Sequence, residues 1–227
     1  MTLSAISYAA GYTTGLLAFL WMARTRKLMT EGVIILMFAG LLGGLAFAGL
    51  TQRIIGGTAG KTVLGAIAGG YLCVAVCKKL LGVRRPLGDL FAIAISAGEI
   101  LGRFGCYFGK CCYGKSCNLP WAVYQHGAFR HPTQIYLSLA NFAILGILLI
   151  YNRKSPPENA LFYMQAALYS IFRFVMEFWR ETPPPVMGLS IAQWACIVGF
   201  LFFSYRFTKL RKCVPSLCPD AVSASKS

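Results

Sequence analysis

Apolar and polar residues alternate along this chain in long blocks rather than residue by residue. The apolar blocks are long enough to supply the ~20 residues with which a helix crosses the hydrocarbon core of a bilayer. Short polar segments, many of them basic, separate the blocks. We therefore predict an all-α integral membrane fold with about seven transmembrane helices, over residues 3–22, 32–50, 62–77, 87–105, 133–151, 160–179 and 187–205.

The composition supports a protein that is embedded in a membrane. Of the 227 residues, 57% are hydrophobic and 13% are charged, whereas roughly 25% of the residues of a soluble domain are charged. The predicted helices use nearly the whole chain, so we expect one polytopic membrane domain over residues 1–205 and a basic, serine-rich tail over residues 206–227. Because no basic segment precedes the first apolar block, we predict a first spanning helix there and not a cleavable signal peptide.

The distribution of basic residues predicts the orientation of the helices. Lysine and arginine are enriched in the cytoplasmic loops of membrane proteins. With the N-terminus outside, every dense basic cluster and the C-terminus fall on the cytoplasmic side. The net charge of +15 then reflects topology and attraction to anionic lipid, so we expect no nucleic-acid partner. The clusters are Arg24, Arg26 and Lys27; Lys78, Lys79, Arg84 and Arg85; Arg153 and Lys154; and Arg206, Lys209, Arg211, Lys212 and Lys226.

Two sets of ionisable residues fall inside predicted spans, near their outer ends. Ionisable side chains are costly in lipid and usually serve a function there. The spacings of three and four residues place each set on one helix face, where opposite charges pair. A run of three prolines at 183–185 is expected to end the sixth span. The residues are Glu99 and Arg103 in the fourth span, and Tyr169, Arg173, Glu177 and Arg180 in the sixth.

These charged sets are open to two interpretations. In the first, the pairs only neutralise one another and tie helices together. In the second, arginine is in excess, because Glu177 faces two arginines and Arg103 and Arg130 lie on the same outer side. A guanidinium grips a phosphate with two parallel hydrogen bonds. We favour the second interpretation, which predicts a phosphate site at the level of the outer lipid headgroups.

The predicted outer loop, residues 106–132, holds four of the nine cysteines and both histidines. On an oxidising outer face, these cysteines are expected to form two disulfides. Reactive thiols and a zinc site are the alternatives. Because no Cys-x-x-Cys pair occurs, we favour disulfides and predict no metal. The four residues are Cys106, Cys111, Cys112 and Cys117.

A third segment, residues 131–136, begins the fifth predicted span. Its proline suits the first turn of a helix, and its histidine has a side chain that exchanges protons near neutral pH. His131, Gln134 and Tyr136 are all expected to reach the headgroup zone. A single histidine at this level acts either as a hydrogen-bonding anchor or as a general base.

Together and in this order, these three segments resemble the prolipoprotein diacylglyceryl transferases, bacterial enzymes that move diacylglycerol from phosphatidylglycerol to a lipoprotein cysteine. The likeness covers about residues 98–181. Gly102-Arg103-Phe104-Gly105, followed by Gly114, is similar to the family's Gly-Arg-x-Gly-Asn stretch. Residues 131–136 resemble its His-Pro-Ser/Thr-Gln-Leu-Tyr segment, and residues 169–180 its Tyr-Gly-x-x-Arg-Phe-x-x-Glu-x-x-Arg segment. That family also has seven spans and an outer N-terminus.

The resemblance implies a role for each matching residue. Arg103 would face the lipid phosphate, and Arg173 and Arg180 would hold phosphoglycerol while Glu177 orients them. His131 is the candidate base. The catalytic set is thus Arg103, His131, Arg173 and Glu177. The substrate-binding set is Gly102, Gly105, Cys106, Cys111, Gly114, Gln134, Tyr136, Tyr169 and Arg180.

The chain departs from the family pattern at several positions. Cys106 stands in place of the signature asparagine, Cys111 in place of an acidic residue, and Leu137 in place of a glutamate. The family's His-Gly-Gly in the third span has no histidine match here. Tyr8 or Tyr12 only partly matches the tyrosine of the first span.

From these features we predict an enzyme of the bacterial cytoplasmic (inner) membrane, a phosphatidylglycerol:prolipoprotein diacylglyceryl transferase-like protein. Its expected partners are phosphatidylglycerol or another anionic phospholipid and the signal peptides of prolipoproteins, and no cofactor is expected. The departures leave two alternatives. One is a phospholipid-dependent transferase with a different acceptor, and the other is a phospholipid-binding membrane protein without catalysis.

Overall fold

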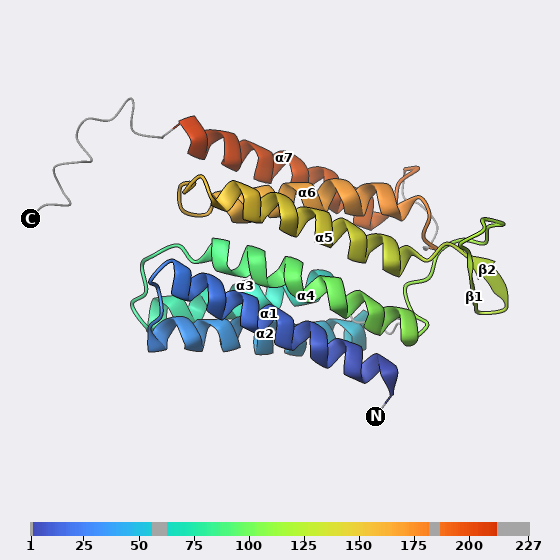
Figure 1. Ribbon diagram of the computed structural model, residues 1–227, viewed down its shortest axis with the longest axis horizontal. Coiled ribbons are helices and arrows are strands. Elements are labelled where there is room, and N and C mark those ends of the chain that lie inside the picture. Colours follow the sequence, from blue (N-terminus) through green and yellow to red (C-terminus); the bar gives the residue numbers. More distant parts are fainter. Residues whose placement is uncertain (1, 56–62, 182–186, 213–227) are drawn as a thin grey trace, which may run out of the picture.

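The protein folds as a bundle of helices with a small hairpin at one end, seen in a computed structural model that describes residues 2–55, 63–181 and 187–212 (Figure 1). Each predicted apolar block coincides with one helix, although the second and seventh helices extend five and seven residues beyond the predicted ends at 50 and 205. The prolines at 183–185 and the tail beyond residue 212 lie outside the described residues. The helices are α1 (Leu3–Thr25), α2 (Glu31–Ile55), α3 (Val63–Leu80), α4 (Gly88–Phe108), α5 (Thr133–Asn152), α6 (Ala160–Glu177) and α7 (Ile191–Lys212).

The helices identify an integral membrane protein. Within the described residues, five of them, α1, α2, α4, α5 and α7, are long and apolar enough to cross a bilayer. Helix α6 falls outside this group and carries Arg173 and Glu177 within its 18 residues. Large apolar side chains such as Leu42, Phe142 and Leu201 are more than 60% exposed, which suits contact with lipid and not with water.

Helix α4 lies at the centre of the bundle and packs against α1, α5 and α6. Its buried residues Leu90, Ile93 and Ala97 recur three or four positions apart, so they form one continuous face. Helices α2 and α3 pack together on one side, and α6 and α7 on the other (Figure 1). The central position of α4 brings its C-terminal half, which carries Arg103, next to α6.

Glycines allow two of these helix pairs to approach closely. A Cβ atom on Gly11 of α1 would lie 2.8 Å from the backbone nitrogen of Gly102 on α4. Similarly, a Cβ on Gly70 of α3 would lie 3.1 Å from the carbonyl oxygen of Gly40 on α2. Because lipid supplies no hydrophobic force between helices, such close van der Waals packing is a main source of their association.

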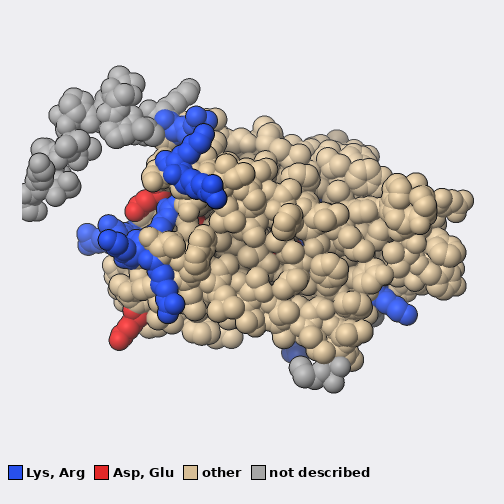
Figure 2. All heavy atoms as spheres, viewed as in Figure 1, with Lys and Arg blue, Asp and Glu red and all other residues tan. Residues whose placement is uncertain are grey.

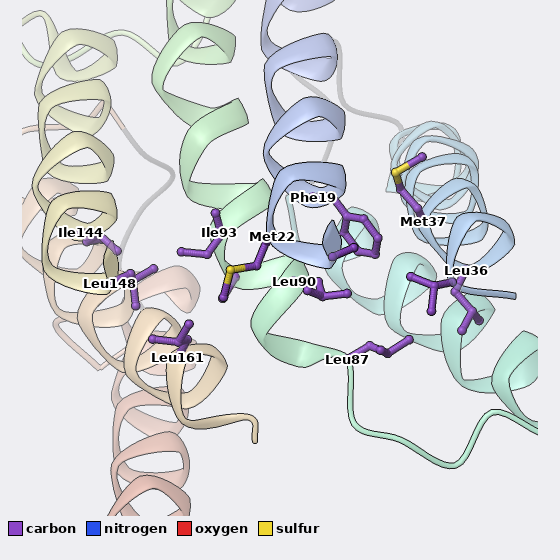
Figure 3. Packing of buried hydrophobic residues seen from close by; sticks show 13 residues of the cluster. Phe19, Met22, Leu36, Met37, Leu87, Leu90, Ile93, Ile144, Leu148 and Leu161 are labelled. Carbon is purple, nitrogen blue, oxygen red and sulfur yellow. The ribbon is translucent and has the colours of Figure 1, made fainter. Parts of the chain in front are cut away.

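The apolar core is formed by side chains of α1, α2, α4, α5 and α6 (Figure 3). There Phe19 and Met22 of α1 meet Leu90 of α4, and Leu148 of α5 meets Leu161 of α6, all of them almost fully buried. Arg103, which is also buried, lies near the other end of α4.

An ion pair with a buried carboxylate joins α1 to α4 beside this apolar core. Asp89 is only 4% exposed, and its Oδ2 lies 2.9 Å from a terminal nitrogen of Arg26 on α1. The same carboxylate accepts hydrogen bonds from the backbone nitrogens of Asn159 and Phe162, each at 3.1 Å. Asp89 of α4 therefore joins α1 to the start of α6. Its buried charge is stabilised by Arg26 and by these two backbone nitrogens.

Replacing Asp89 by alanine is expected to destabilise the protein, because it leaves the partly buried guanidinium of Arg26 and two backbone nitrogens without their carboxylate. Breaking a fully buried pair costs about 3–5 kcal/mol, and the loss here is expected to be smaller because Arg26 is partly exposed and keeps its bond to Asn152. Thermal unfolding of the purified protein in detergent would show a lower apparent melting temperature. Glu158→Ala, at an exposed position shortly before α6, is the matched control. Equal melting of both variants would contradict a fastening role for Asp89.

Candidate active site

Arg103 connects α4 to α6 near the hairpin end of the bundle. The residue is buried, and its Nε donates a hydrogen bond to Oε2 of Glu99 at 2.6 Å. One of its terminal nitrogens donates to the hydroxyl of Tyr169 on α6 at 3.1 Å. The pair with Glu99 that the sequence spacing predicted is thus present. The Tyr169 bond adds the further partner that a buried guanidinium requires.

Glu177, at the end of α6, forms ion pairs with two further arginines. Its Oε2 accepts a hydrogen bond from Arg173 one helical turn earlier, and Arg180 lies 3.5 Å from the same oxygen. The other carboxylate oxygen accepts a hydrogen bond from the hydroxyl of Ser190 at 3.2 Å. The sequence placed Arg180 on the sixth helix, but α6 ends at Glu177, so Arg180 belongs to the segment that follows it.

The three arginines share neighbours and therefore converge on one region. Tyr169 accepts a hydrogen bond from Arg103 and lies one helical turn before Arg173 on α6. The Cys112 thiol is within range of both Arg103 and Arg180. The guanidiniums thus reach this region from α4, from α6 and from the segment after α6.

Charge is unevenly balanced in this region. Three guanidiniums face two carboxylates, Glu99 and Glu177, so arginine is in excess. Arg130, which we also expected here, instead pairs with Glu181 at 2.8 Å and lies over the ring of Tyr113. It fastens the outer loop and does not join the cluster. The three remaining arginines form a region suited to a phosphate group.

The chain after α4 runs between two other segments, like the middle strand of a small sheet. On one side, the nitrogen of Lys115 donates to the carbonyl of Trp179 at 2.8 Å, and the nitrogen of Glu181 to the carbonyl of Tyr113 at 3.3 Å. On the other side, the nitrogen of His131 donates to the carbonyl of Lys115 at 3.1 Å. Beyond it, strands β1 (Val123–Gln125) and β2 (Ala128–Arg130) form the hairpin. This arrangement fixes the outer loop against the end of α6.

Gly114 sits at the tightest point of this arrangement. It is buried and pairs with Arg180 in antiparallel fashion. A Cβ atom at Gly114 would lie 2.5 Å from the carbonyl oxygen of His131 and 2.8 Å from that of Trp179. Both neighbours are backbone atoms that cannot rotate away, so only glycine fits. The resemblance had marked Gly114 as substrate-binding, and the structure gives it a packing role.

Three cysteines bring their thiols together at the C-terminal end of α4. The Sγ atoms of Cys106, Cys111 and Cys112 all lie within 4.8 Å of one another. They are free thiols, as is Cys117, so the two predicted disulfides are not formed in the described part of the chain. The hydroxyl of Tyr8 on α1 donates to the Cys106 sulfur at 3.3 Å and lies 3.9 Å from the Cys111 sulfur. The cluster and Tyr8 were not connected by the sequence.

The thiols after α4 differ in acidity. Hydrogen bonds from Cys106 and Cys111, together with the charges of Arg180 and Arg103, hold the pKa of the Cys112 thiol well below its ordinary value. Hydrogen bonds with Cys106 and Cys112 raise the pKa of the Cys111 thiol. A thiolate is thus favoured at Cys112, beside the arginines.

Side chains at the start of α5 donate hydrogen bonds to the backbone of Cys111 and Cys112. Gln134 is almost fully buried, and its Nε2 donates to the carbonyl of Cys111 at 2.8 Å. The hydroxyl of Thr133 donates to the carbonyl of Cys112, also at 2.8 Å. Gln134 therefore positions the thiol cluster, whereas the sequence had placed it at the headgroup level as a substrate contact.

His131 and Tyr136 lie in an aromatic group at the rim of the site. The His131 ring is 6.3 Å from that of Tyr136 and 6.4 Å from that of Trp179. The Tyr136 hydroxyl accepts a hydrogen bond from the indole of Trp121 at 2.7 Å. Among the described residues, no hydrogen bond or ion pair joins the His131 side chain to the three arginines, and its buried Nδ1 has no partner.

The remaining predicted glycines lie within α4. Gly105 contacts α1, because a Cβ there would be 2.7 Å from the ring of Tyr8, and its carbonyl accepts a hydrogen bond from Ser4 at 2.9 Å. A Cβ atom at Gly102, the residue before Arg103, would meet no other heavy atom within 4 Å. The structure thus unites Arg103, Tyr169, Arg173, Glu177 and Arg180, with Cys106, Cys111 and Cys112 beside them.

Comparison with known proteins gives a consistent result. A family model described as prolipoprotein diacylglyceryl transferase matches residues 3–208. Curated relatives are each named phosphatidylglycerol--prolipoprotein diacylglyceryl transferase. That of Clostridium tetani is 34% identical over 164 residues, covering 66% of this chain and 66% of the relative. The Campylobacter lari protein is 31% identical over 165 residues (69% and 61%), and the Finegoldia magna protein 36% over 132 residues (57% and 52%). The chain therefore spans less than two thirds of the length of these relatives.

Proposed function

The chain belongs to the prolipoprotein diacylglyceryl transferase family, and from this premise we propose that it transfers diacylglycerol from phosphatidylglycerol to the cysteine thiol of a lipoprotein precursor. The observation that carries the proposal is the convergence of Arg103, Arg173 and Arg180 beside buried Tyr169 and Glu177. The printed names of the relatives contain both substrates.

The arginines fit the phosphodiester of the lipid headgroup. Arg103 approaches from α4. Arg173 and Arg180, which both contact Glu177, approach from α6 and from the segment that follows it. Each guanidinium is already oriented by a carboxylate, so little side-chain freedom is lost when an anion binds. Planar forks match phosphate oxygens in pairs, which makes a phosphodiester a better occupant than a carboxylate of similar charge.

The proposed topology has seven spans, an outer N-terminus and a cytoplasmic C-terminus in the bacterial inner membrane. Lysines and arginines gather at the end of the bundle opposite the hairpin (Figure 2), as expected for the cytoplasmic side. The arginine region then lies at the outer headgroup level, and residues 1–205 form one membrane domain. A phospholipid reaches this level by lateral diffusion, without crossing the bilayer.

The reaction is a thiol attack on the glyceryl carbon that bears the phosphate. A carbon–sulfur bond forms, the carbon–oxygen bond to phosphate breaks, and glycerol-1-phosphate departs with the electron pair. Negative charge grows on the departing phosphate, and the three arginines stabilise it there. The acceptor thiol must lose its proton, and His131, whose Nδ1 has no partner, is the candidate base within this scheme.

The test supplies purified protein with phosphatidylglycerol labelled in its acyl chains and a peptide that carries a lipoprotein cleavage-site cysteine. Labelled peptide and released glycerol-phosphate are the expected products. The same peptide with serine in place of cysteine is the control and should stay unlabelled. Glycerol-phosphate released with label on another product would instead establish a different acceptor. Bound lipid without any product would show that the protein binds phospholipid but does not catalyse transfer.

A further inference from the structure

The thiol cluster of Cys106, Cys111 and Cys112 is not needed by the reaction as drawn above. We propose that these three thiols bind one zinc ion as thiolates, and that the remaining position of the zinc takes the acceptor thiol. This inference rests on the proposed function, because only that function supplies an acceptor thiol. Three protein ligands and one open position are the usual form of a catalytic zinc site.

The positions of the sulfur atoms suit this coordination. Zinc bonded tetrahedrally to sulfur at 2.3 Å places the sulfur atoms ~3.8 Å apart, and the three Sγ atoms here lie within 4.8 Å of one another. Rotations about the Cα–Cβ bonds close this difference. Lys110 and Cys112 have φ angles of 50° and 57°, so the backbone turns sharply on both sides of Cys111. This turn explains how adjacent cysteines come to face a common point.

The backbone of the cluster is already fixed. The carbonyls of Cys111 and Cys112 accept hydrogen bonds from the buried side chains of Gln134 and Thr133, and the nitrogen of Cys111 donates to the carbonyl of Cys106 at 3.1 Å. Outer contacts that orient ligands in this way raise metal affinity. Since the loop is held before any metal binds, little ordering remains to be done on binding.

The surrounding charge suits a zinc–thiolate group. Three thiolates and one zinc ion carry a net charge of −1, which is costly in a partly buried site without a cation nearby. The positive charges of Arg103 and Arg180 both interact with the Cys112 sulfur, and that of Arg103 also interacts with the Cys106 sulfur. These guanidiniums compensate the anionic complex. The hydroxyl of Tyr8 offers a further hydrogen bond to the Cys106 sulfur.

Zinc at this place would supply the nucleophile of the proposed reaction. A thiol that coordinates zinc loses its proton outright, and the proton passes to water or a nearby base. The zinc-held sulfur then forms its bond to the glyceryl carbon as the carbon–oxygen bond to phosphate breaks. No electron is gained or lost by the metal. The thioether product binds zinc weakly because it is neutral, so the product is free to leave.

Metal binding itself is tested on the full chain, purified under reducing conditions and treated with a chelator. Titration with zinc should give one ion per chain, and cobalt(II) in its place should give sulfur-to-metal charge-transfer absorption. Cys106→Ser, Cys111→Ser and Cys112→Ser are each expected to lower zinc affinity by at least about 100-fold. Cys117→Ser, in the same loop, should leave it unchanged. A zinc affinity that survives all three substitutions would overturn the site.

A second measurement needs no variant and so does not depend on correct folding of the mutants. Zinc should protect Cys106, Cys111 and Cys112 of the unmodified protein from an alkylating reagent, while Cys117 stays reactive. Peptide mapping by mass spectrometry reads this directly. Equal alkylation with and without zinc would contradict the site.

Activity separates this inference from the function on which it rests. Removal of zinc should stop transfer to the peptide, and added zinc should restore it. Full transfer by the zinc-free protein would overturn the activating role while the proposed function stands. Zinc binding at the three thiols with no lipid product under any condition would instead overturn the proposed function.

Discussion

Substitution of Arg103 by alanine is expected to lower kcat/KM for diacylglyceryl transfer by at least about 100-fold, a typical loss when one preorganised donor to developing charge is removed. Arg103 is the buried guanidinium that joins Glu99 on α4 to Tyr169 on α6. Without it, the departing phosphate loses its contact from α4. Initial rates with labelled phosphatidylglycerol and the acceptor peptide measure the change.

Three further variants test the role of Arg103. Arg103→Lys keeps the charge but loses the planar fork, so it should recover only part of the lost rate. Arg53→Ala removes an exposed arginine at the end of α2 and should leave the rate unchanged. Arg103→Ala also leaves the Glu99 carboxylate without its partner. The double variant Arg103→Ala/Glu99→Gln controls for this by removing that charge. A normal rate in Arg103→Ala or in Arg103→Ala/Glu99→Gln would refute the phosphate role.

Gly114→Ala is expected to damage both stability and activity, because the added methyl group meets two backbone carbonyls. Overpacking at a rigid position costs typically about 1–3 kcal/mol. The loop must then shift away from the end of α6, which moves Cys112 away from Arg180. A lower melting temperature and a fall in transfer rate of at least about 10-fold, or 1.4 kcal/mol, should appear together.

A matched glycine controls for the substitution itself. Gly146 of α5 has open space where a Cβ would stand, and alanine favours a helix over glycine. Gly146→Ala should therefore melt no lower than the unmodified protein and should keep full activity. If Gly114→Ala behaved in the same way, the tight fit between the loop and α6 would be disproved.

The sequence anticipated the helices well because each depends on a local property. A continuous apolar block must bury its backbone hydrogen bonds in a helix when lipid surrounds it. Each block accordingly coincides with a helix, from α1 to α7, in the described part of the chain. The ion pairs of Arg103 with Glu99 and of Arg173 with Glu177 were equally predictable, since a helix brings residues four apart onto one face.

Other features of the site were hidden because they join segments far apart in the chain. The hydrogen bond from Arg103 to Tyr169 spans 66 residues, and that from Tyr8 to Cys106 spans 98. Nothing in the spacing of either residue indicates its partner. The outer loop was read as disulfide-bonded because four cysteines lie close together in sequence. The folded loop instead sets three thiols face to face and leaves Cys117 out of the group.

By itself, the sequence determined which segments are helical in a membrane, which charges share a helix face and which family the motifs resemble. These follow from the period of the helix and from the cost of polar groups in lipid, both of which act over a few residues. Only the tertiary structure decided that Gln134 and Thr133 hold the thiol loop and that Arg180 turns back to Glu177. Such contacts depend on how helices pack and where loops cross, and short-range spacing carries no record of either.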